Sequence, residues 1–134
     1  MAEVNEAMAE YLKTHRTALL ATNRKQGAPQ QTLISYHWDG SNFAVSVRGF
    51  SQKAKNLRLR PDASLAVIDG ARQLIATGKI TVIEDPAEVL RLNKERMRQV
   101  AARQETDDEL ADRLRREERV ILLLTPERFY PPSL

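Results

Sequence analysis

Hydrophobic and polar positions follow a helical period in some parts of the chain and a strand period in others. Val4 and Tyr11 lie on one face of a helix near the N-terminus, whereas Ile34 and Tyr36 alternate with polar residues as in a half-buried strand. The predicted elements are a helix over residues 3–15, strands over 17–22, 30–38 and 42–48, a helix over 51–60, strands over 63–68 and 73–83, helices over 86–103 and 106–118, and a strand over 119–125 before an irregular tail over 126–134.

Short turns between the strands indicate an antiparallel sheet. Asp39-Gly40 is a strong hairpin signal, so the first three strands are predicted to form an antiparallel meander. Gly78 interrupts a long strand and predicts a bulge or a close backbone approach. Because antiparallel hairpins dominate, the pattern predicts a mainly β, α+β fold built on a small closed or split barrel rather than a doubly wound sheet.

The helices carry clear start and stop signals. Ser51 is an N-cap candidate and Pro61 ends the short helix that follows it. Pro86 suits the first turn of the next helix, and Thr106 with Glu109 makes a capping box that restarts the helical segment. The charge-mixed helices between Glu88 and Arg119 are predicted to form a solvated outer face.

Composition narrows the function classes. The 134 residues include no cysteine, which excludes disulfides, thiolate metal sites and cysteine nucleophiles. No secretory signal opens the chain, so a soluble cytoplasmic protein is expected. His15 and His37 are the only histidines, and neither has further ligands at metal spacing, so no metal site is expected. With few aromatic residues the core must be mostly aliphatic, and a partner subunit would help to bury it.

The net charge of +3 is concentrated in one place. The window from Arg48 to Arg60 holds five bases and no acid. Helix N-termini normally attract acids, yet Gln52, Lys53 and Lys55 occupy this one. An external anion would remove that conflict, since the first N–H groups of a helix are unpaired. On a helical wheel Lys53, Asn56 and Arg60 share one face, which predicts an anion-binding surface.

Several segments together resemble one protein family. Lys53-x-x-Asn56-Leu57-x-x-x-Pro61-x-x-Ser64-Leu65 is similar to the phosphate-binding segment of the pyridoxamine 5'-phosphate oxidase-like, split-barrel flavoprotein superfamily. Thr17–Thr22 resembles its opening hairpin, and Glu118–Tyr130 its final strand and tail. Gly49-x-Ser51-Gln52-Lys53-Ala54-x-Asn56 and Asp69-Gly70-Ala71-Arg72 look like the actinobacterial branch that uses the deazaflavin coenzyme F420. Many members carry Arg or Lys where Ser51 stands, which favours that branch over FMN users.

The resemblance implies a homodimer with an isoalloxazine-like ring in a groove at the interface. It implies one split-barrel domain over 1–134, with an N-terminal helix over 1–16, barrel strands over 17–83 that contain a phosphate turn over 48–60, a helical segment over 86–118, and a last strand and tail over 119–134. The implied cofactor-binding residues are Gln30, Gln31, Thr32, Leu33 and Ile34 along the ring, and Arg48, Gly49, Ser51, Gln52, Lys53, Lys55 and Asn56 around the phosphate.

The function implied is an F420-dependent oxidoreductase that transfers a hydride from the reduced deazaflavin to a small conjugated or quinone-like acceptor. Alternatives are an FMN-dependent oxidoreductase on the same barrel and a non-catalytic F420 or flavin carrier. Because the cofactor carries the chemistry, no catalytic acid or base is assigned. Gln31, Thr32 and Ser35 are the polar candidates to tune the ring. The basic window is too narrow for a nucleic-acid face, and neither nucleic acid nor a membrane is expected as a partner.

Overall fold

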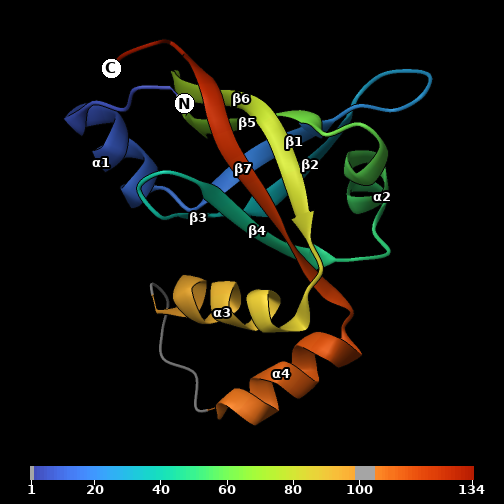
Figure 1. Ribbon diagram of the computed structural model, residues 1–134. Helices are drawn as coiled ribbons and strands as arrows, with labels where there is room; N and C mark the ends of the chain where they lie inside the picture. Colours follow the sequence, from blue (N-terminus) through green and yellow to red (C-terminus); the bar gives the residue numbers. More distant parts are fainter. Residues whose placement is uncertain (1, 99–104) are drawn as a thin grey trace.

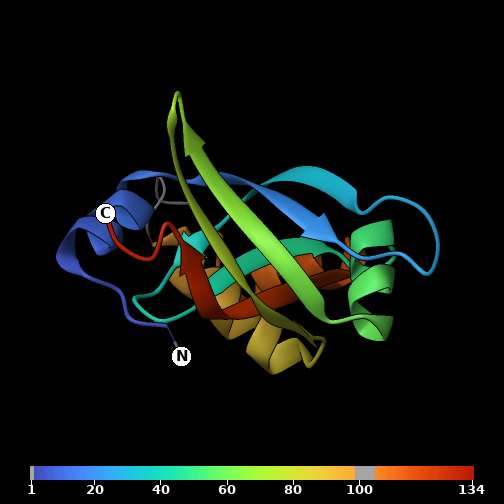
Figure 2. The same ribbon diagram turned by 90° about the horizontal axis from the view of Figure 1, so that it is seen from above.

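A computed structural model describes residues 2–98 and 105–134 of the chain. A seven-stranded antiparallel sheet curls into a half-open barrel, and four helices lie around it (Figures 1 and 2). The sheet order is β2-β1-β5-β6-β7-β4-β3. The elements are α1 (Glu6–Thr14), β1 (Thr17–Thr22), β2 (Gln30–Ser35), β3 (His37–Trp38), β4 (Phe43–Arg48), α2 (Gln52–Leu59), β5 (Asp62–Asp69), β6 (Arg72–Ile83), α3 (Pro86–Met97), α4 (Asp107–Arg116) and β7 (Arg119–Tyr130). The predicted split-barrel, α+β fold class is confirmed.

The barrel is open along one seam. The predicted strand over 30–38 breaks at Tyr36, whose N–H donates to the carbonyl of Arg16 at 2.9 Å. Its first half, β2, pairs with β1, while its second half, β3, pairs with β4 only as far as Ala44. The two antiparallel pairings of the predicted meander are confirmed, but its middle strand is not continuous, so the three segments do not lie side by side in one meander. Among the described residues, β2 has β1 as its only strand partner, and residues 45–48 of β4 have only β7, so two strand edges diverge from Tyr36.

Alternating side chains fill the inside of the barrel. Phe43 and Val45 of β4, Leu65 of β5 and Leu122 of β7 are all fully buried in one aliphatic core. The ring of Phe43 packs against Trp38, with centroids 4.6 Å apart, and edge-on against Tyr36. The three rings therefore pack together on either side of the Asp39-Gly40 turn.

The helices α3 and α4 stack on the outer face of β4 and β7 (Figure 1). Leu92 of α3 packs on Ala44 and Ile121, which point away from the barrel interior. Val89 of α3 meets Leu110 and Leu114 of α4 in a third apolar cluster. The predicted solvated outer face is present, with exposed ion pairs on both helices, and each helix also buries one apolar stripe.

Two further boundaries differ from the prediction. The last strand does not stop at Thr125 but continues to Tyr130, because Pro126 falls opposite Gly78 at a bulge, where a missing N–H is tolerated. That bulge confirms the prediction for Gly78, where a Cβ atom would lie 2.6 Å from the carbonyl oxygen of Thr125. The helix α3 ends at Met97, and the rest of the predicted helix, over 99–103, lies outside the described residues. No helix in the described parts of the chain is long and apolar enough to cross a membrane.

Candidate functional site

The turn between β4 and α2 is built as its sequence predicts. Ser51 is the N-cap of α2, and its hydroxyl oxygen accepts from the N–H of Ala54 at 3.4 Å. Gly49 donates its N–H to the carbonyl of Glu118 at 2.7 Å, and a Cβ atom on Gly49 would lie 3.1 Å from that oxygen. The glycine therefore allows β4 to approach the start of β7, which fixes where α2 begins. Gln52 and Lys53 are in the first turn of α2, where backbone N–H groups have no carbonyl acceptor within the helix.

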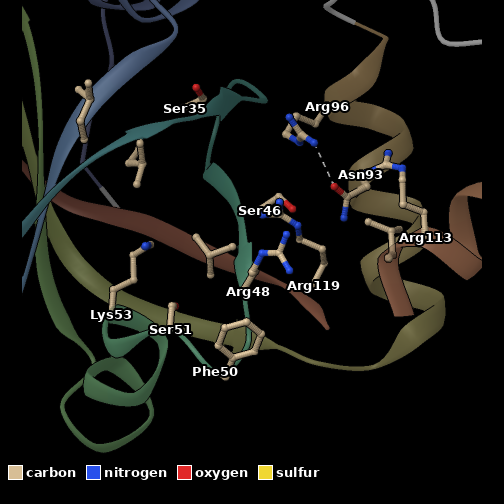
Figure 3. A pocket seen from close by; sticks show the side chains of 14 residues that line it. Ser35, Ser46, Arg48, Phe50, Ser51, Lys53, Asn93, Arg96, Arg113 and Arg119 are labelled. Carbon is tan, nitrogen blue, oxygen red and sulfur yellow. Dashed lines mark hydrogen bonds between the residues drawn. The ribbon is translucent and has the colours of Figure 1, made fainter. Parts of the chain in front are cut away.

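A cavity of about 460 Å³ lies where β2 and β4 diverge (Figure 3). One side is formed by β2, the opposite side by β4 and the α2 turn, and the far wall by α3, α4 and the start of β7. The lining residues are Leu33, Ile34, Ser35, Ser46, Val47, Arg48, Phe50, Ser51, Lys53, Asn93, Arg96, Arg113, Leu114 and Arg119. The seam of the barrel thus opens onto a chamber that the helices partly enclose.

The chamber is cationic. Five of its lining residues are Arg or Lys and none is Asp or Glu. Within residues 2–98 and 105–134, neither Arg48 nor Lys53 has an ion-pair partner. Arg48 lies 6.0 Å from the centroid of the Phe50 ring. Uncompensated positive charge around an enclosed space favours an anionic ligand.

Acidic residues behind the chamber hold its far wall in place. Glu105 accepts two hydrogen bonds from Arg113, at 2.9 and 3.2 Å. Glu117 accepts from Arg113 at 3.5 Å and from the Nε of Arg119 at 2.9 Å. The hydrogen bond with Glu105 raises the pKa of Arg113, and the hydrogen bond from Arg119 lowers the pKa of Glu117. These four residues, called the Glu105–Glu117 network, hold both arginines in place through hydrogen bonds to carboxylates.

Asn56 does not share a surface with Lys53. It is only 4% exposed, and its amide donates to the hydroxyl of Thr22 at 3.1 Å and to the side-chain oxygen of Gln30 at 3.2 Å. Its own oxygen accepts from Gln52 at 2.9 Å. The helical-wheel interpretation is therefore wrong. Asn56 ties α2 to β1 and β2 from within, while Lys53 faces the chamber.

The structure brings together only part of the predicted set. Leu33, Ile34, Arg48, Ser51 and Lys53 line the chamber. The remaining residues lie elsewhere: Gln30, Gln52 and Asn56 form the network just described, Gln31 is exposed and Thr32 half-buried on β2, and Gly49 and Lys55 line a neighbouring groove of about 510 Å³.

The far wall was not predicted. Asn93 and Arg96 on α3, Arg113 on α4 and Arg119 on β7 are more than 30 residues from the basic window. A signal was present in the apolar spacing of Val89 and Leu92, which marks a buried stripe next to Asn93. Among the residues that the structure describes, no three His, Asp or Glu side chains gather as a metal site would require.

Comparison with known proteins agrees with this architecture. An F420 reductase is 26% identical, with a TM-score of 0.68, over 94% of this chain and 98% of that one. The conserved hypothetical protein Rv2991 from Mycobacterium tuberculosis is 24% identical, with a TM-score of 0.79, over 96% of this chain and 84% of that one. The heme storage protein HutZ from Vibrio cholerae shares the fold at 19% identity, with a TM-score of 0.69, over 96% and 94% of the two chains.

Sequence comparison gives one family and no individual relative. No curated protein matches the chain. A family profile described as pyridoxamine 5'-phosphate oxidase matches residues 4–131, which is nearly the whole length and includes both the seam and the α2 turn. The chain therefore belongs to the pyridoxamine 5'-phosphate oxidase family, with the split barrel of flavin- and deazaflavin-binding proteins.

Proposed function

We propose that this protein is an F420-dependent oxidoreductase, which transfers a hydride from the reduced deazaflavin to a small conjugated or quinone-like acceptor. The observation that carries the proposal is the cationic chamber at the barrel seam, with Lys53 and the first turn of α2 on one side and the free edge of β2 on another. Its likeness to an F420 reductase over nearly the whole of both chains supports this choice of cofactor.

The residues present fit a flat ligand that carries a phosphate. Lys53, the hydroxyl of Ser51 and the unpaired N–H groups at the start of α2 suit a phosphate. Leu33, Ile34 and Val47 supply apolar surface for a ring. Because β2 lacks a second strand partner among the described residues, its backbone N–H and C=O groups are free to bond the polar edge of such a ring.

The bound deazaflavin would supply the hydride chemistry. The chain's own residues would bind and orient it: Lys53 and the α2 turn hold the phosphate, and β2 sets the plane of the ring. The Asn56 hydrogen bonds connect α2 with β1 and β2, so the phosphate turn and the strand keep a fixed spacing. The helices α3 and α4 form one wall of the chamber and would shield that side of a bound ring from water.

The active form in this proposal is a homodimer, with the chamber completed by the partner. Leu33 beside the chamber is 68% exposed, and Phe50 at its rim is 53% exposed. Large apolar side chains that gather at the mouth of a site are typical of an interface. A second subunit would cover both and close the open side of the chamber.

The test is a titration of the purified, ligand-free protein with F420 and with FMN. We expect F420 to bind at least about tenfold more tightly, a difference of about 1.4 kcal/mol. Reduced F420 should then be consumed when a quinone is added. Tight FMN binding with no measurable F420 binding would replace the proposal with the FMN-dependent alternative. F420 binding without turnover across a set of acceptors would instead identify a carrier.

A further inference from the structure

We infer that the chamber has a second anion subsite, formed by Arg48 and Arg119, and that this subsite selects acceptors that carry a carboxylate next to their conjugated system. The inference rests on the proposed function and names its substrate class. It follows from how the cations are distributed around the chamber.

The cations fall into two groups (Figure 3). Lys53 lies with Ser51 at the α2 turn, whereas Arg48 and Arg119 lie together across the chamber, near the wall formed by α3 and α4. A phosphate held by Lys53 and the N-terminus of α2 leaves the arginine pair unused. Both groups line one cavity of about 460 Å³, so two anionic groups can be bound at the same time.

The arginine pair is a costly arrangement without an anion. Arg48 and Arg119 are direct cross-strand neighbours in the β4–β7 ladder, where like charges are destabilising. Arg48 has no ion-pair partner in the described parts of the chain. Arg119 bonds Glu117 only through its Nε, so its two terminal nitrogens are available to a ligand. A carboxylate between the two guanidinium groups would offset their repulsion and accept from both.

The Glu105–Glu117 network holds one member of this pair, Arg119, in a fixed orientation, while Arg48 is exposed beside the Phe50 ring. Arg113 donates from each of its three side-chain nitrogens to Glu105 or Glu117, and Glu117 in turn orients Arg119. Arginine forks of fixed orientation discriminate planar carboxylates from neutral groups of the same shape. The subsite would therefore hold the acceptor by its carboxylate, with its conjugated part toward β2.

The proposed step needs no oxidant or reductant other than the acceptor and the reduced cofactor. The reduced cofactor would supply one hydride and one proton. The hydride is added to one carbon of the acceptor's conjugated double bond, and the proton reaches the other carbon through water. Two electrons move, and the carboxylate is unchanged.

The test compares trans-cinnamate with trans-cinnamamide, which has the same shape without the charge. Calorimetry of the F420-loaded protein should give at least about tenfold tighter binding of cinnamate. In Arg119→Gln this preference should fall below about threefold, and Arg119→Lys should retain part of it. Arg91→Gln is the matched control, since Arg91 lies on α3, pairs with Glu88 and does not line the chamber. Equal affinity for the two probes, or a preference unchanged in Arg119→Gln, would overturn the inference.

A second arm separates the acceptor from the cofactor's own oligoglutamate tail. The same titrations are repeated with F420 that lacks the glutamates. A cinnamate preference that persists with the shortened cofactor supports the inference. A preference for carboxylates that appears only with the shortened cofactor would mean that the tail normally occupies the arginine pair, and would overturn it. Turnover of reduced F420 with no preference for cinnamate refutes the inference alone. If F420 does not bind, the cinnamate titration is made with the ligand-free protein, and a preference seen there refutes the proposed function while the anion subsite stands.

Discussion

Arg48 on β4 and Arg119 on β7 are directly opposite each other in the antiparallel ladder, and both line the chamber. Their carboxylate partners are unequal: Glu117 accepts from Arg119, whereas no described residue forms an ion pair with Arg48. Two positive side chains therefore repel each other at the site where a ligand is proposed to bind.

This repulsion predicts an unusual response to salt. Raising the ionic strength from about 0.01 M to 0.3 M should stabilise the wild type relative to Arg48→Gln by about 0.2–1 kcal/mol, because salt screens the repulsion only where Arg48 is present. The measurement is urea unfolding of both proteins at each ionic strength. Arg91→Gln should respond with the opposite sign, since salt there screens an attraction to Glu88. Parallel salt responses in all three proteins would contradict the prediction.

Lys53 should contribute binding energy but little stability. We expect Lys53→Ala to weaken F420 binding by about 1.5–3 kcal/mol, the range for a hydrogen bond to a charged group. The melting temperature should stay within a few degrees, because Lys53 has no ion-pair partner among the described residues. Lys79→Ala, which removes an exposed lysine paired with Asp62, is the control for loss of charge. Unchanged affinity in Lys53→Ala would place the phosphate elsewhere.

Asn56, unlike Lys53, should contribute mainly to the stability of the fold. Replacing it with Ala leaves the buried Thr22 hydroxyl and the Gln30 oxygen without their donor, which should lower the free energy of unfolding by about 1–3 kcal/mol. Chemical denaturation measures this loss, and a double-mutant cycle with Thr22→Val isolates the pairwise part. Additive effects of the two substitutions would show that the hydrogen bond contributes nothing.

Leu33 tests the proposed homodimer. An aspartate at this position should dissociate the dimer, since a buried leucine at an interface contributes about 1.5–3 kcal/mol and the charge adds a desolvation cost. Light scattering during gel filtration would report the change in mass. Leu59→Asp is the matched control, because Leu59 is 75% exposed on α2 and does not line the chamber. If both variants keep the wild-type mass, Leu33 is not at the interface.

Glu117 gives a pH dependence of defined sign. Its pKa is lowered from 4.5 by the hydrogen bond from Arg119 and by the charges of Arg119 and Arg113, so folding favours the carboxylate. The stability that it contributes is fully present above the unfolded pKa and is lost as pH falls through the lower, folded pKa. The difference in unfolding free energy between wild type and Glu117→Gln should thus be constant from neutrality to about pH 5 and shrink below it. The same substitution in an Arg119→Gln background should show a smaller pH-dependent part.

The sequence predicts well those features that depend on neighbours along the chain. Ser51, Pro86 and the Thr106–Glu109 capping box all begin helices where expected, because capping uses only the next few residues. Gly78 forms the expected bulge because no side chain fits against Thr125. Six predicted strands, most of them joined by short connections, were enough to predict a small closed or split barrel.

Partner choice and burial are not local properties. The alternation of apolar residues continues through Tyr36, so nothing in the pattern reveals that the chain changes strand partner there. A helical wheel places Asn56 beside Lys53 but does not say that β1 and β2 cover one of them. Arg96 on α3 and Arg113 on α4 reach the chamber because α3 packs on Ala44 and Ile121 and α4 packs on α3, which are contacts between distant segments.

The seam beside Tyr36 has a mechanical consequence. A barrel in which β2 and β4 are not hydrogen-bonded to each other can widen between these two strands. A ligand bound between them would connect the two edges. Binding at the seam would therefore stabilise the barrel, and we expect amide exchange along β2 to slow when the site is occupied. A ligand bound there as proposed would be a structural element of the barrel as well as a reactant.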